Sequence, residues 1–246
     1  MNRSINRRDF VAAGSVIACG LGVSQVSASH CAEEERKTSI PVQEGEKIQL
    51  LTPQTEGGMP FFEALAKRKT TRVFKREMPD LQTLSNLLWA AAGINRPDGR
   101  RTAPTALNSQ EIFIFVILPN GVYCYQPAEN SLLRCAEGNF QNLAGNQNYA
   151  KEVPVTFVYV ADLNRSNCSP ETQESYARVD CGFIGQNVYL FAAAAGLASV
   201  FRGSIDHKAL AKLFKLGEKQ MVLYAQSIGY PDEEKVQAAP SMLKLK

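Results

Sequence analysis

Arg68-Lys69-Thr70-Thr71-Arg72-Val73-Phe74 is the stretch of this 246-residue chain that says most about its fold. Three cations and two hydroxyls occupy five consecutive positions there, shortly before an aromatic residue. Arginine makes charge-assisted hydrogen bonds to phosphate, and hydroxyl groups add shorter ones. The segment is therefore typical of a phosphate site, and its alternative interpretation is a solvated, charged helix end. A polar loop, Pro104-Thr105-Ala106-Leu107-Asn108-Ser109-Gln110, follows later and runs into an apolar strand.

Helical and strand patterns alternate around these two segments without strict βαβ regularity. Pro60 opens a helical pattern, Asp80 is expected to cap a helix that ends at Gly93, and Asp206 caps another. The apolar face of the first pattern is Phe62, Leu65 and Ala66. Buried strands are expected at 112–118, 122–125, 153–161, 198–201 and 221–228, while residues 129–151 are interpreted as mixed helix and loop. This order predicts an α+β layer fold with a mostly antiparallel sheet flanked by helices.

The segment 176–195 is predicted to be a long helix that is apolar almost all round, so we expect it to be buried on most sides. Asp180, Gln186 and Asn187 interrupt it and make a membrane-spanning interpretation poor. One small domain offers too little surface to cover such a helix. We therefore expect it to lie at the interface of a twofold homodimer.

The two polar segments resemble the flavin-binding segments of the nitroreductase family, and the resemblance extends over residues 60–232. Arg68, Thr70 and Arg72 match the family pattern R-x-[ST]-x-[RK], with Lys69 between them. The resemblance implies that the first basic residue and the hydroxyl hold the phosphate of FMN. It implies that the last basic residue lies at the pyrimidine edge of the flavin.

The loop at 104–110 resembles the family loop P-S-S-x-N-x-Q-P-W, which the partner subunit places over the flavin. Its matching positions include Pro104, Thr105, Ala106 and Asn108, where Ala106 replaces one hydroxyl. Glu111-Ile112 stands where the family has Pro-Trp, so the floor of the pocket is expected to differ. The alternative interpretation of the loop is an ordinary turn before a strand.

Two further segments carry the resemblance. The stretch from Gly196-Leu197 to Arg202-Gly203-Ser204 matches the family segment whose backbone N–H groups reach flavin N5, where they stabilise the reduced ring. Asn146 matches a family asparagine near the flavin edge, and its alternative is a polar loop residue.

The basic pair that usually follows the last strand is replaced by Lys244 and Lys246 at a different spacing, so the phosphate is expected to depend more on Arg68 and Arg202. Residues 89–97 and 101–104 resemble the branch that includes the azoline-oxidising dehydrogenases.

Composition narrows the classes of function. The net charge of +3 is not clustered, which argues against a nucleic-acid groove. Only two histidines occur, His30 and His207, so histidine-dependent triads and multi-histidine metal sites are nearly excluded. No P-loop or Rossmann glycine pattern occurs, and no C-x-x-C pair indicates zinc or a dithiol motif. A Cys124–Cys135 disulfide is one alternative, and a packing role for these thiols is the other.

The N-terminus resembles a twin-arginine export signal, with Arg7-Arg8-Asp9-Phe10 followed by an apolar run of small residues. We expect a signal peptide at 1–28, or a lipoprotein signal that ends before Cys19 and anchors the chain through that residue. A polar tether and arm at 29–58, the FMN-binding domain at 59–232 and a tail at 233–246 complete the expected organisation. Export places the mature domain in the periplasm or otherwise outside the cytoplasm.

These expectations combine into an exported FMN-dependent oxidoreductase that moves hydride or electrons between a donor and a small organic acceptor. The flavin is expected to carry the chemistry, so no catalytic protein acid or base and no metal is assigned. One alternative is a non-catalytic flavin-binding carrier or scavenger outside the cytoplasm. Another is a structural exported domain without a cofactor.

Overall fold

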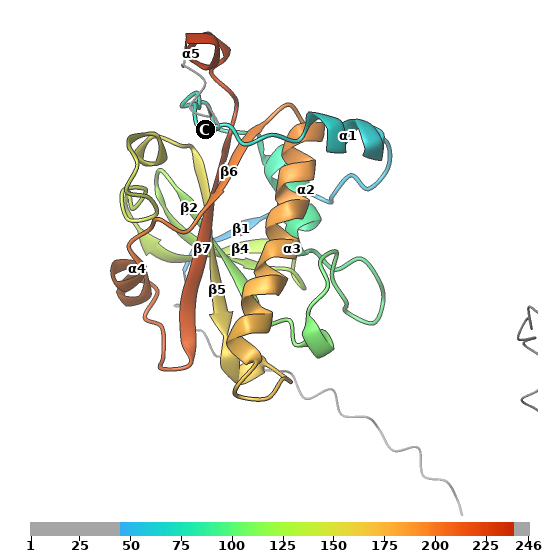
Figure 1. Cartoon of the computed structure of the whole chain (residues 1–246), viewed down its shortest axis with the longest axis vertical. Coiled ribbons are helices and arrows are strands. Elements are labelled where there is room, and N and C mark those ends of the chain that lie inside the picture. Colours follow the sequence, from blue (N-terminus) through green and yellow to red (C-terminus); the bar gives the residue numbers. More distant parts are fainter. Residues whose placement is uncertain (1–44, 239–246) are drawn as a thin grey trace, which may run out of the picture. The chain divides into compact units, whose positions relative to one another are not determined.

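An antiparallel sheet of seven strands forms the centre of the computed structural model, which describes residues 45–238 (Figure 1). The strand order is β1-β4-β3-β2-β5-β7-β6, and every neighbouring pair is antiparallel. The strands are β1 (Lys47–Gln49), β2 (Ile112–Leu118), β3 (Gly121–Gln126), β4 (Ser131–Glu137), β5 (Val155–Asp162), β6 (Ala198–Arg202) and β7 (Gln220–Gly229). The expected export signal, Cys19 and the tail lysines lie outside the described residues.

Helices cover both faces of this sheet, as Figure 1 shows. The α-helices are α1 (Phe61–Lys67), α2 (Leu81–Ala92), α3 (Gln173–Ala194), α4 (His207–Leu213) and α5 (Glu233–Ala238). Three 3₁₀ turns, η1 (Ala106–Asn108), η2 (Asn148–Lys151) and η3 (Leu163–Arg165), lie in the connections. The predicted α+β layer fold with a mostly antiparallel sheet is confirmed.

The central strands explain why the layers form. All seven residues of β2 are buried, and alternate side chains point to opposite faces of the sheet. Ile112, Ile114 and Val116 join the core that α2 and α3 cover. Phe113 and Phe115 join the core on the other face, where Phe115 stacks on Phe214 beyond α4 at 4.2 Å between ring centres. A strand that is apolar on both sides therefore fixes a layer on each side.

Helix ends follow the expected capping residues. The Asp80 carboxylate accepts the Thr83 N–H at 2.7 Å and begins α2, which ends at Gly93. Asp206 begins α4 in the same way. After α3, Gly196 adopts a φ of 69°, the left-handed conformation that glycine tolerates best and that stops a helix.

The apolar faces of α1 and α3 are only partly covered within one chain. Along α3 one face is buried, while Tyr176, Val179 and Phe183 are 47%, 51% and 44% exposed. In α1 the buried residue is Ala64, whereas Phe62 is 83% exposed. One chain therefore does not cover α3 on most sides, in line with the expectation that a single domain offers too little surface for it.

One expectation is corrected by the structure. Residues 129–151, interpreted as mixed helix and loop, contain strand β4, which pairs with β3 and with β1 from the expected arm. Cys124 and Cys135 are free thiols, so of the two alternatives for them the disulfide is not realised. Within residues 45–238, no helix has the length and apolar character needed to cross a membrane.

Candidate functional site

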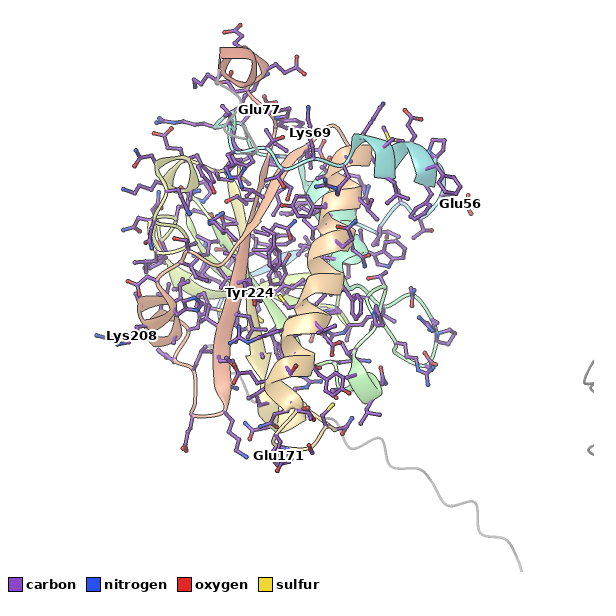
Figure 2. The ribbon with its side chains drawn as sticks, viewed as in Figure 1. Glu56, Lys69, Glu77, Glu171, Lys208 and Tyr224 are labelled. Carbon is purple, nitrogen blue, oxygen red and sulfur yellow. The ribbon has the colours of Figure 1, made fainter. Side chains whose placement is uncertain are left out.

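The cationic segment leaves the end of α1 and runs beside β6. The Arg68 backbone N–H donates to Ala64 O at 2.9 Å and closes α1. Thr71 is buried, and its backbone N–H donates to Ser199 O of β6 at 3.0 Å. The exposed side chains are Lys69, Thr70 and Arg72, and Figure 2 shows Lys69 near the C-terminal end of α3.

Tyr189 of α3 connects this segment to β6. Its hydroxyl oxygen accepts the Phe201 backbone N–H at 2.8 Å and lies 3.1 Å from Thr70 Oγ1. With one lone pair occupied by Phe201, the tyrosine can donate its own proton to Thr70. The Thr70 hydroxyl proton is then free to donate to an anion. The chain of hydrogen bonds thus prepares Thr70 as a donor.

Positive charge in the segment is not compensated. Within residues 45–238, Arg68, Lys69 and Arg72 form no ion pair, whereas the nearby Arg76 pairs with Glu152 at 2.6 Å. The Arg68 guanidinium carbon lies 5.4 Å from the centre of the Tyr189 ring, which orients it. A groove of about 660 Å³ adjoins the segment and is lined by residues that include Lys69, Tyr189, Gly196 and Pro231. The segment therefore has the charge, the donors and the open space that an anionic ligand requires.

Gly203 and Ser204 follow β6 and are exposed. A methyl group at Gly203 would lie 3.6 Å from the Tyr224 ring, an ordinary contact. Packing within the chain therefore does not require glycine at this position. Glycine at this position would instead allow a ligand to approach the backbone closely.

Arg202 is placed differently from the expected phosphate contact. The residue is buried, and its guanidinium donates to Ala144 O at 3.1 Å from Nε and to the Ser227 hydroxyl. Burial lowers the pKa of Arg202 to about 10. Asn146 is exposed on the same loop, beside Gly145, whose backbone packs against the Arg202 guanidinium. Arg202 and the Asn146 loop thus lie together, but Arg202 uses its donors inside the protein rather than facing the cationic segment.

The loop at 104–110 has a rigid, unusual backbone. Asp180 of α3 is buried, and its Oδ2 accepts the Ala106 N–H at 2.8 Å. The Thr105 hydroxyl oxygen accepts the Gln110 N–H at 3.0 Å. Three non-glycine residues have left-handed φ angles between 50° and 52°, namely Leu107, Asn108 and Gln110. Such conformations persist where surrounding bonds impose them, so the loop shape is built into the fold.

A carboxyl pair lies beneath this loop. Glu111 and Asp180 are each 2% exposed, and neither Glu111 oxygen has a hydrogen-bond partner among the described side chains and backbone. Burial raises the pKa of Glu111 to about 7, and the charge of Asp180 adds to the rise while Arg101 opposes it. The pair therefore holds a proton near neutral pH, at the position where the sequence pattern substitutes Glu for Pro.

One chain does not bring the cationic segment and the loop together. Tyr189 supports the segment near one end of α3, and Asp180 supports the loop nine residues earlier. At a rise of 1.5 Å per residue, the two attachment points are about 13 Å apart along the helix axis. Figure 2 places Lys69 and Glu171 near opposite ends of α3.

Comparison with known proteins shows which family shares this sequence and fold. The sequence profile of the nitroreductase family matches residues 65–230. The chain belongs to the nitroreductase family. The solved structure of a candidate nitroreductase from Ralstonia eutropha JMP134 shares 35% identity, covers 77% of this chain and 91% of its own, and superposes with a TM-score of 0.71. A candidate nitroreductase from Methanocaldococcus jannaschii is 26% identical over 190 residues, which are 73% of this chain and 96% of that protein.

The fold is therefore nitroreductase-like, and family membership indicates an oxidoreductase. The NADPH:FMN oxidoreductase of Vibrio harveyi, solved with NAD⁺, shares the fold at 19% identity and a TM-score of 0.53, with 70% of this chain and 69% of that chain covered. At that level of identity the likeness concerns the fold alone.

Three residues of the site were missed in the sequence. Tyr189 and Asp180 looked like parts of a helix, and their partners lie 119 and 74 positions away. Glu111 carried a signal, because an acid between a polar loop and a wholly apolar strand is an unusual choice. The family substitution of Pro by Glu therefore pointed to a buried carboxyl.

Proposed function

We propose that this chain is an FMN-dependent oxidoreductase whose phosphate site is the segment from Arg68 to Arg72. The observation that carries the proposal is the uncompensated charge of this segment together with the oriented Thr70 hydroxyl. Because no carboxylate among the described residues pairs with these side chains, the segment can attract a dianionic phosphate. The solvated charged helix end, the alternative interpretation, does not explain why Tyr189 and Phe201 orient Thr70.

The residues present fit FMN. Arg68 and Lys69 offer cationic donors beside Thr70, while Arg72 extends the positive surface. Gly203 leaves the backbone beyond β6 open to a ring edge. FMN, when bound, supplies hydride or electron transfer to a small organic substrate. The chain's own residues bind the phosphate and orient the ring, and Arg202 acts by holding the loop around Asn146 in place.

A twofold homodimer is part of the proposal. The loop of Thr105 and Asn108 sits at the end of α3 away from the cationic segment, so it suits a neighbour's flavin better than its own. Tyr176, Val179 and Phe183 form a stripe at helical spacing on the exposed side of α3, and an isologous contact would cover it. An uncovered apolar surface of this kind marks an interaction site.

Export through the twin-arginine route completes the proposal. Arg7 and Arg8 precede the apolar run, and Cys19 offers an alternative lipid anchor. This route suits a protein that folds around its cofactor before it leaves the cytoplasm. It also implies an electron donor other than cytoplasmic nicotinamide cofactors. The resemblance to azoline-oxidising dehydrogenases at 89–97 gives a first class of substrates to try.

The test is the visible spectrum of the purified mature domain and the identity of the flavin released on denaturation. We expect FMN, and we expect Arg68→Ala to weaken its binding by about 1.5–3 kcal/mol, the range for a hydrogen bond to a charged group. Arg76→Ala is the matched control, because Arg76 lies nearby but pairs with Glu152. A colourless protein that takes up no FMN would overturn the proposal. If FMN binds but no donor reduces it, the binding site would be supported and the proposed enzymatic activity would be overturned.

A further inference from the structure

A cavity of about 220 Å³ lies between the end of α2, the start of β2 and the turn that joins β3 to β4. It shares no residue with the cationic segment or with the Arg202–Ser204 stretch, although Gln110 and Ile112 of its lining belong to the stretch that resembles the family's flavin loop. Its apolar lining comes from residues that include Ile94, Ile112, Phe113 and Pro127. Its charged lining comes from two arginines, Arg101 and Arg165, which lie far apart in the sequence.

Arg101 is held at the cavity by its backbone. A β-bridge between Ile94 and Arg101 fixes the position of the residue. Its Nη1 reaches Ile112 O at 3.4 Å, a long hydrogen bond, and its buried Nε has no hydrogen-bond partner among the described residues. A buried guanidinium N–H without an acceptor is costly, and an anion in the adjoining cavity would offset part of that cost through its charge.

Arg165 brings a second cation to the same cavity. Its guanidinium carbon lies 5.0 Å from the centre of the Phe113 ring. Burial, followed by repulsion from Arg165, lowers the pKa of Arg101 to about 10, while Tyr125 and Glu111 oppose this change. An anion in the cavity would offset the repulsion that Arg165 exerts on Arg101.

Tyr125 adds a polar group to the lining. It is 3% exposed, and burial raises its pKa to about 12, so its hydroxyl keeps its proton. A protonated phenol donates to an anion and not to a cation. Arginine forks, a phenol and an apolar wall together match a molecule with a charged, planar head and a compact apolar body.

We infer that this cavity binds a small organic carboxylate, with its carboxylate between Arg101 and Arg165 and its hydrocarbon body against Phe113 and Ile94. The guanidinium geometry matches a carboxylate in a bidentate way. Inorganic phosphate would leave the apolar part of the wall without a contact. The inference does not depend on FMN binding, since neither Arg101 nor Arg165 belongs to the proposed phosphate site.

Calorimetric titration of the purified protein, with whatever cofactor it carries, tests the inference. The probes are cyclohexanecarboxylate, the uncharged cyclohexanecarboxamide of the same shape, and inorganic phosphate. We expect saturable binding of the carboxylate, with the amide and phosphate each weaker by at least about tenfold. The flavin spectrum is recorded during the titration and should not change.

The variants localise the binding. Arg165→Gln and Tyr125→Phe should each weaken carboxylate binding by about tenfold or more. Arg100→Gln is the matched control, because Arg100 is exposed on the same loop as Arg101 and does not line the cavity. Arg101→Met is a secondary variant because Arg101 also supports the bridge to Ile94. Equal binding of acid and amide, equal binding of phosphate, or binding unchanged in both primary variants would overturn the inference.

Discussion

Replacing Glu111 by Gln is expected to stabilise the fold above neutral pH and to remove a pH dependence of the wild-type protein. Burial and Asp180 raise the pKa of Glu111 from 4.5 to about 7. The folded state therefore holds this proton more tightly than the unfolded chain does. The free energy of unfolding should fall as the pH rises from 4.5 to about 7 and then stay level, because both states are ionised above that range.

The size of the effect follows from the same shift. One pKa unit corresponds to about 1.4 kcal/mol, so the shift of Glu111 from 4.5 to about 7 sets the upper bound of the effect. We therefore expect Glu111→Gln to be more stable than the wild type by roughly 1–3 kcal/mol at about pH 8, and nearly equal to it at about pH 4.5. Glutamine keeps the shape of the protonated acid and can donate to Asp180 without ionising.

Urea unfolding at a series of pH values measures this difference as a change in the midpoint at constant slope. Glu77→Gln is the control, since Glu77 is exposed (Figure 2) and its replacement should leave the pH profile unchanged. The reasoning fails if wild type and Glu111→Gln show the same dependence of stability on pH. It also fails if the variant is less stable than the wild type at high pH.

Three further outcomes are expected. Tyr189→Phe leaves the Phe201 N–H without its acceptor, so it should destabilise the fold by about 1–3 kcal/mol in urea unfolding. It should also weaken FMN binding. A variant with wild-type stability would contradict the chain of hydrogen bonds from Phe201 through Tyr189 to Thr70. Arg72→Ala should shift the reduction potential of bound flavin, measured by dye-coupled titration, more than it changes the affinity for flavin. An unchanged potential would contradict the placement of Arg72 at the flavin ring. Phe183→Asp should convert a dimer to a monomer and release FMN, as followed by light scattering with the exposed Lys208→Asp as control. A wild-type monomer that keeps FMN would contradict the shared interface.

Much of the fold was readable because its signals are local. The apolar run of β2, the caps at Asp80 and Asp206 and the glycine at 196 each act within a few residues. Strand β4 was not readable in this way. Its sequence, Ser131–Glu137, mixes polar and apolar residues, and its conformation depends on ladders with β3 and β1 on either side.

The candidate site likewise combines local signals, which could be predicted from the sequence, with long-range contacts, which could not. The cationic segment and the loop could be recognised from their composition, and the structure leaves Lys69, Arg72 and Asn108 exposed. What supports them was hidden, because the bonds from Tyr189 and Asp180 join residues far apart in the chain. Arg202 is the opposite case, because a family position and a cation suggested a ligand contact, whereas the guanidinium donates to Ala144 O and to the Ser227 hydroxyl.

The left-handed residues of the 104–110 loop have a kinetic consequence. Asp180, Thr105 and Ser109 hold this loop in one shape within a single chain, so its conformational entropy is lost during folding and not during assembly. A segment that is already ordered meets its partner without a conformational search. If the loop covers a neighbour's flavin, subunits should associate at the rate of rigid bodies, with no slow step after encounter. Thr105→Ala would loosen the loop, and its main effect should then be slower subunit association rather than a change in the assembled enzyme.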